Sequence, residues 1–124
     1  MKPLVLAGAI LLGYVTGCTH RASLGLTQSV PSVPELIDRA AADYGIPGAA
    51  RHLRAIAWCE SRFFPGAYNR SSGASGLFQF VPTTYRWMSE MAGLPGTSPY
   101  DPWAASRVAA WAFAHGYARH WSCA

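Results

Sequence analysis

Several short apolar stretches of this chain have a proline near the start and a glycine near the end. Each such stretch is a predicted helix. Proline is tolerated in the first turn of a helix, and glycine readily adopts the left-handed conformation that ends one. Within these stretches apolar residues recur at intervals of three and four, and no stretch alternates convincingly enough for a strand. The sequence therefore predicts a mainly α-helical fold, with short helices over about 32–45, 47–60, 82–93 and 101–116.

The composition is that of a single domain with a buried core. Of the 124 residues, 51% are hydrophobic and only 13% are charged, a balance that excludes a charged disordered tail. The formal net charge is +4, but Lys2 is the only lysine and the arginines stand singly instead of forming a basic run. A mixed solvated surface explains this pattern better than a phosphate-binding stripe, so we expect no nucleic-acid partner.

The N-terminus has the features of an export signal. Lys2 precedes the mostly apolar residues 4–16, a run with the length of a signal-peptide core and short for a membrane span. Residues 15–18, Val-Thr-Gly-Cys, resemble the lipobox of bacterial lipoproteins. We therefore expect an exported cell-envelope lipoprotein held at a membrane by a lipid on Cys18, although a plain cleavage site with an incidental cysteine would also fit. The predicted organisation is a signal peptide over 1–17, a tether over 18–31 and a folded domain over 32–124.

Two cysteines remain for the folded domain if Cys18 carries the lipid. Cys59 and Cys123 form an even pair in a chain predicted to be exported, and a disulfide is the default state of such a pair. A zinc site that also uses a histidine is the alternative, but the CxxC and HExxH spacings of common zinc sites do not occur in the sequence. We expect the disulfide, no metal ion and no cofactor.

Glu60 is the acidic residue best suited to catalysis. It continues the apolar stripe of Leu53, Ile56 and Ala57 at the i+7 position, near the C-terminal end of the second predicted helix. Burial and the negative end of the helix dipole both disfavour a carboxylate, so we expect a raised pKa and a proton available for general acid catalysis. The alternative is an ordinary glutamate at a helix end, paired with Arg62.

No second carboxylate is well placed to act together with Glu60. Most glycoside hydrolases use two carboxyl groups. The other acids of this chain fall on the first predicted helix, on the exposed side of the third, or at the N-cap of the fourth. If this protein cleaves sugars, we therefore expect a mechanism with a single carboxyl group. The acids in question are Glu35, Asp38, Asp43, Glu90 and Asp101.

Residues 59–85, CESRFFPGAYNRSSGASGLFQFVPTTY, resemble the lysozyme-like SLT domain of lytic transglycosylases. Glu60 and Ser61 match the catalytic Glu-Ser pair of that family. Asn69 lies in the A-x-N loop that follows, and residues 76–79, Gly-Leu-Phe-Gln, match the GLMQ-like motif. The resemblance implies a lysozyme-like fold of short helices around a substrate groove.

The positions of the two cysteines add to this resemblance. Cys59 directly precedes the glutamate, and the sequence Trp-Ser-Cys over 121–123 ends at Cys123. In this respect the chain is similar to compact variants related to resuscitation-promoting factors, in which a disulfide links these two points. The resemblance thus implies the same Cys59–Cys123 pairing.

The family resemblance also implies a substrate and a mechanism. The substrate would be the glycan strands of peptidoglycan. Glu60 would protonate the oxygen that links N-acetylmuramic acid to N-acetylglucosamine and would then act as base on the muramoyl C6 hydroxyl, which gives a 1,6-anhydro product. Phe80 and Tyr85 could equally be core residues, and Asn69 a turn former. The residues implied in substrate binding are Ser61, Asn69, Gln79, Phe80 and Tyr85.

Other functions remain open from the sequence. The domain could hydrolyse peptidoglycan as lysozyme does, with water in place of the C6 hydroxyl. It could bind glycan without cleaving it, with Glu60 serving only as a hydrogen-bond partner. It could also be a structural lipoprotein that recruits a partner at the wall. We expect a monomer in each case.

Overall fold

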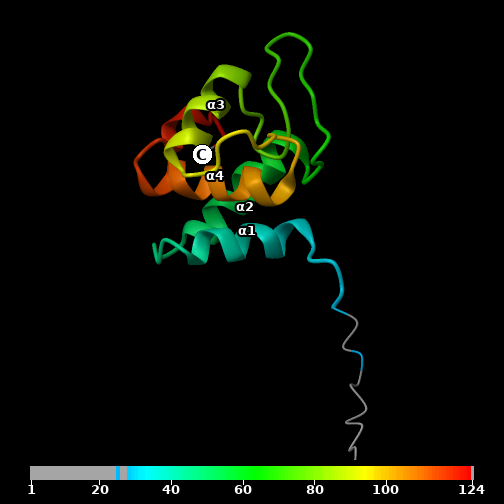
Figure 1. Cartoon of the computed structure of the whole chain (residues 1–124), viewed down its shortest axis with the longest axis vertical. Coiled ribbons are helices and arrows are strands. Elements are labelled where there is room, and N and C mark those ends of the chain that lie inside the picture. Colours follow the sequence, from blue (N-terminus) through cyan, green and yellow to red (C-terminus); the bar gives the residue numbers. More distant parts are fainter. Residues whose placement is uncertain (1–24, 26–27, 124) are drawn as a thin grey trace, which may run out of the picture.

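The computed structural model describes residue 25 and residues 28–123 (Figure 1). This part of the chain contains helices but no strand, only two isolated β-bridges, which join Tyr68 to Ser75 and Ser75 to Phe80. The prediction of a mainly α-helical fold is confirmed. The elements are α1 (Val33–Ala42), α2 (Ala49–Ser61), α3 (Pro82–Met91), α4 (Pro102–Ala114) and the 3-10 turn η1 (Ala118–His120).

Capping residues fix where α1 and α4 begin. The Ser32 backbone N–H donates to the Glu35 carboxylate over 2.7 Å, which completes the capping box at the start of α1. Asp101 caps α4 by accepting a hydrogen bond from the Ala104 N–H over 2.9 Å. Each cap satisfies an N–H that has no partner within its helix. Both helices therefore begin where the sequence predicts.

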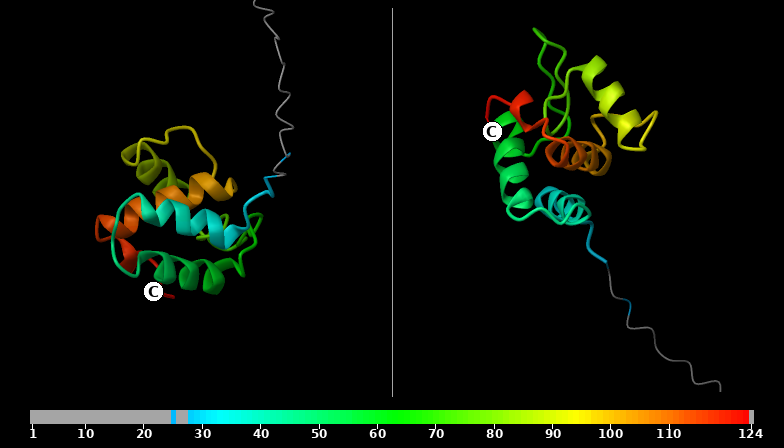
Figure 2. Two further views of the ribbon diagram at one scale, coloured as in Figure 1. Left: turned by 90° about the horizontal axis from the view of Figure 1, so that it is seen from below. Right: turned by 90° about the vertical axis from the view of Figure 1, so that its left-hand side faces the viewer.

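The alanine-rich helix α4 lies at the centre of the fold. It packs against all three other helices, and Figure 2 shows it between α1 and α3. Small side chains let helices approach closely, and four consecutive residues on one turn of α4, 109–112, are almost completely buried. Two ion pairs also connect α1 to its neighbours, Asp38 with Arg54 of α2 over 3.3 Å and Asp43 with Arg107 of α4 over 3.9 Å.

A turn at residues 76–79 closes the long segment between α2 and α3. Ser75 and Phe80 exchange two backbone hydrogen bonds, of 3.0 and 3.1 Å, across this turn. Gly76 has a φ of +79°, and a Cβ at this position would collide with the carbonyl oxygen of Pro99. Only glycine allows this close approach, so the turn is held directly against the loop before α4.

Two contacts attach the segment after η1 to the rest of the domain. Cys59 and Cys123 form a disulfide, with their Cα atoms 6.0 Å apart, as the sequence predicts. The Trp121 side chain is 7% exposed, and its indole N–H donates to the Phe78 carbonyl over 2.7 Å. Residues 121–123 are thereby held beside the end of α2 and beside the turn at 76–79.

Two structural findings concern only the described part of the chain. None of its helices has the length and hydropathy needed to cross a membrane. It also contains no group of three or more His, Cys, Asp or Glu side chains arranged to hold a metal ion. The predicted signal peptide over 1–17 and the lipidation at Cys18 lie outside the described residues.

Candidate active site

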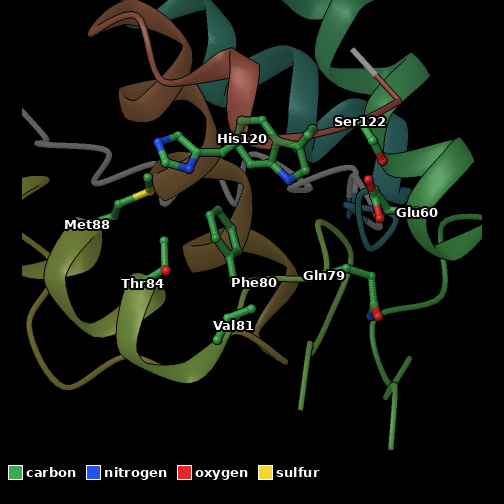
Figure 3. A pocket seen from close by; sticks show the side chains of 9 residues that line it. Glu60, Gln79, Phe80, Val81, Thr84, Met88, His120 and Ser122 are labelled. Carbon is green, nitrogen blue, oxygen red and sulfur yellow. The ribbon is translucent and has the colours of Figure 1, made fainter. Parts of the chain in front are cut away.

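A pocket of about 260 Å³ contains Glu60. Its wall is built from the end of α2, the turn at 76–79 with the residues just after it, one face of α3, and the segment 120–122 (Figure 3). The segment 120–122 is more than forty positions along the chain from the turn it faces, so only the fold brings these groups together. The lining residues are Glu60, Gln79, Phe80, Val81, Thr84, Met88, His120, Trp121 and Ser122.

Glu60 is a half-buried acid in this pocket. The residues before it on the same face of α2, Leu53, Ile56 and Ala57, are completely buried. Glu60 lies where that face reaches the end of α2 and opens into the pocket. Burial raises the pKa of its carboxyl group above the ordinary value, as the sequence predicts, because a charge is less stable when it is removed from water.

Arg62 does not neutralise Glu60. Its guanidinium lies 5.0 Å from the centre of the Trp58 ring and donates to the Trp58 carbonyl over 3.4 Å. Arg62 adopts a left-handed conformation, with φ of 53°, directly after α2. The described structure therefore contains no Glu60–Arg62 ion pair, and the pKa of Glu60 stays raised.

Among the described residues that line the pocket, Glu60 is the only acid. Glu35 and Asp101 cap helices, and Asp38 and Asp43 pair with arginines. Glu90, the remaining acid of the sequence, is exposed on α3 and does not line the pocket. The described part of the chain therefore places no second carboxylate in this pocket.

Gln79 and Phe80, two of the residues that the family resemblance implies in binding, line the pocket. Gln79 has a φ of 50°, unusual for a residue other than glycine. Its side-chain amide donates to the Ala67 and Gly76 carbonyls over 3.2 and 3.0 Å, which leaves its Oε1 free to accept a hydrogen bond. Phe80 is 4% exposed, and its ring packs edge-on against Trp121. Both residues thus form part of the pocket wall.

Three other residues implied in binding do not line this pocket. The Ser61 hydroxyl is buried and donates to the Ala57 carbonyl over 2.9 Å within α2. The Asn69 side chain accepts a hydrogen bond from the Ser71 N–H over 2.9 Å, which makes Asn69 a turn former. Tyr85 is 3% exposed, its ring packs behind Phe80, and its hydroxyl lies 3.0 Å from the Thr97 hydroxyl.

The structure adds polar residues that the sequence analysis did not identify. Thr84, His120 and Ser122 all line the pocket, together with the apolar residues after the turn and on α3. A signal for Ser122 existed in the sequence, because it adjoins Cys123 just as Glu60 adjoins Cys59, so a disulfide brings the two neighbours together. Thr84 stands one helical turn before Met88, on the same face of α3.

The arrangement suits acid catalysis on a sugar-like molecule. Phe80, Val81 and Met88 form an apolar part of the pocket wall, and hydroxyl and amide groups near such a wall can bind the polar substituents of a ligand. Glu60 supplies one proton at one end of the pocket (Figure 3). Such a site can protonate a leaving oxygen and can accept a proton afterwards.

A comparison with protein families agrees with this chemistry. A family model described as the transglycosylase SLT domain matches residues 35–121. The matched range includes α1 from its third residue onward, the other three helices, the turn at 76–79, and the pocket except for Ser122. No curated protein and no solved structure matches the chain.

Proposed function

This chain belongs to the transglycosylase SLT family, and on that basis we propose that it is a peptidoglycan lytic transglycosylase. It cleaves the β-1,4 bond between N-acetylmuramic acid and N-acetylglucosamine in glycan strands. The observation that carries the proposal is that Glu60, whose pKa is raised by burial, is the only acid among the described residues that line the pocket.

Glu60 acts twice in the proposed reaction. It first donates its proton to the oxygen between the two sugars, and the bond from that oxygen to C1 of the muramoyl residue breaks. The ionised Glu60 then removes the proton of the muramoyl C6 hydroxyl, whose oxygen bonds to C1. Glu60 ends protonated, as it began, and the muramoyl product is a 1,6-anhydro sugar. No water is consumed.

The absence of a second acid in the pocket supports this mechanism over two-carboxylate hydrolysis. Retaining and inverting glycosidases place a second carboxylate as nucleophile or as base for water, and the described residues offer none beside Glu60. In the proposed reaction the acetamido group of the substrate stabilises positive charge at C1. The free Oε1 of Gln79 accepts a hydrogen bond from an acetamido N–H, and Phe80 contacts a sugar ring.

The products of the reaction test the proposal. We expect the purified protein to release fragments from peptidoglycan whose muramoyl ends are lighter by one water than reducing ends, as measured by mass spectrometry. Reducing ends would show a lysozyme-type hydrolase instead. Binding to glycan without release of fragments would show a non-catalytic module, and binding to neither glycan nor its fragments would favour a structural lipoprotein.

The proposal extends to the place where the protein works. Glycan strands of peptidoglycan lie outside the cytoplasmic membrane, and the predicted export signal and lipidation at Cys18 would bring the domain there. We propose that it works there as a monomer. Cells grown with a clickable palmitate analogue are expected to label the wild-type chain and not Cys18→Ser, because the thiol carries the lipid. Labelling of Cys18→Ser at the wild-type level would contradict the lipid anchor, while the cytosolic location of both chains would contradict export.

A further inference from the structure

Ser122 is an exposed residue that is held in place on both sides. On one side Trp121 is buried and its indole N–H is bonded to the Phe78 carbonyl. On the other side Cys123 is joined to Cys59 of α2. A serine with two such neighbours has little backbone freedom. Its hydroxyl therefore stays at the pocket without a helix or strand of its own.

The disulfide places Ser122 opposite Glu60. Cys59 directly precedes Glu60 and Cys123 directly follows Ser122, and the Cα atoms of the two cysteines are 6.0 Å apart. Both Glu60 and Ser122 line the same pocket, and in Figure 3 their side chains point toward one another. His120, which lines the pocket too, lies with Met88 and Thr84 at the other end.

The hydroxyl group next to Glu60 in the sequence is not available to it. Ser61 directs its hydroxyl back to the Ala57 carbonyl inside α2 and is 9% exposed. Arg62 is held on the Trp58 ring. Of the nearby donors, Ser122 is the one that the pocket presents beside the carboxyl group.

We propose that Ser122 is a positioning residue for Glu60, whose hydroxyl donates a hydrogen bond to the carboxylate formed when Glu60 gives up its proton. This inference rests on the proposed function of Glu60. The bond holds the carboxylate in the orientation needed to remove the second proton. Hydrogen bonds to an ionised group are stronger than those between neutral groups, so the contact matters most after the first step.

No charged side chain among the described residues that line the pocket provides this stabilisation in place of Ser122. The only other titratable side chain lining the pocket in the described chain is His120, at the far end, and Cys59 and Cys123 are paired. In the structure burial is the cause of the raised pKa of Glu60, and the proposed bond from Ser122 forms only when the carboxyl group ionises. A donor that binds the ionised form lowers the pKa. The removal of Ser122 should therefore raise it further.

Kinetics of the full chain test the inference. Ser122→Ala is expected to lower kcat for the release of fragments from soluble glycan strands by roughly tenfold, as for one lost hydrogen bond to a charged group, with KM nearly unchanged. Ser122→Thr keeps the hydroxyl and should recover most of kcat. Ser29→Ala, an equivalent change at an exposed serine ahead of α1, is the matched control.

A titration provides a readout that needs no turnover. The carbon-13 shift of the Glu60 carboxyl, followed by NMR against pH, is expected to give a higher pKa in Ser122→Ala than in wild type. In Ser122→Thr the pKa should be close to that of wild type. An unchanged titration in Ser122→Ala would overturn the inference, as would a loss of kcat in Ser61→Ala without one in Ser122→Ala. If wild type does not cleave glycan, the proposed function fails and the titration alone decides the role of Ser122.

Discussion

Glu60→Gln is expected to reduce the release of glycan fragments from peptidoglycan by about a thousandfold or more. The amide can neither donate the first proton nor accept the second, and each general acid or base step contributes about a hundredfold to ten-thousandfold. The lining residues that the structure describes include no other acid that could replace it. The measurement is the initial rate of fragment release, quantified by mass spectrometry.

The loss should occur without unfolding. Burial raises the pKa of Glu60, so the folded state binds its proton more tightly than the unfolded state does. Stability therefore falls as pH rises from the unfolded pKa to the folded pKa, and Glu60 destabilises the folded state above the unfolded pKa. Glu60→Gln should be at least as stable as wild type in thermal unfolding.

Glu90→Gln is the matched control for this change. Glu90 is exposed on α3 and outside the pocket, so its replacement should leave the rate within about twofold. Substantial cleavage by a folded Glu60→Gln protein would contradict the role of Glu60. Equal losses in the two variants would instead indicate a general effect of removing a surface charge on the binding of the polymer.

The second large effect is expected from the disulfide. Replacing both Cys59 and Cys123 with serine should lower the free energy of unfolding by about 4 kcal/mol, because the bond closes a loop with a sequence separation of 64. For a domain of this size the melting temperature would fall by on the order of 20 °C. Circular dichroism during heating measures the change.

Reagents distinguish this effect from that of a metal ion. A thiol reductant should lower the melting temperature of wild type by an amount similar to the double replacement, and EDTA should not change it. The double variant itself should not respond to the reductant. Destabilisation by EDTA together with indifference to the reductant would show that these cysteines bind a metal ion.

The helix starts could be predicted because they depend on local chemistry. Ser32 with Glu35 and Asp101 with Pro102 specify caps that need no distant partner. The start of α2 was harder to predict, since Gly48 has a left-handed conformation and the helix begins after it, two residues later than Pro47 suggests. The turn η1 was not predicted, because it has too few residues to show a periodic pattern.

Only part of the pocket could be predicted from the sequence. The helical period placed Glu60 on an apolar face, and the structure has it at the end of that face. The directions of the Ser61 and Tyr85 side chains depend on neighbours that a motif does not specify, the Ala57 carbonyl and the loop that carries Thr97. The contribution of residues 120–122 depends on the tertiary fold.

The part of the pocket formed by residues 120–122 follows all four helices along the chain. The helical core, with Glu60 at the end of α2, can therefore form before the pocket is complete. The complete pocket also requires that synthesis passes Cys123 and that the two thiols are oxidised. Disulfides form and persist in oxidising compartments. A chain still in a reducing cytosol would hold Glu60 in an unfinished site. If the chain is exported as we propose, the order of synthesis and oxidation delays an activity that cuts the wall until the chain has left the compartment where it was made.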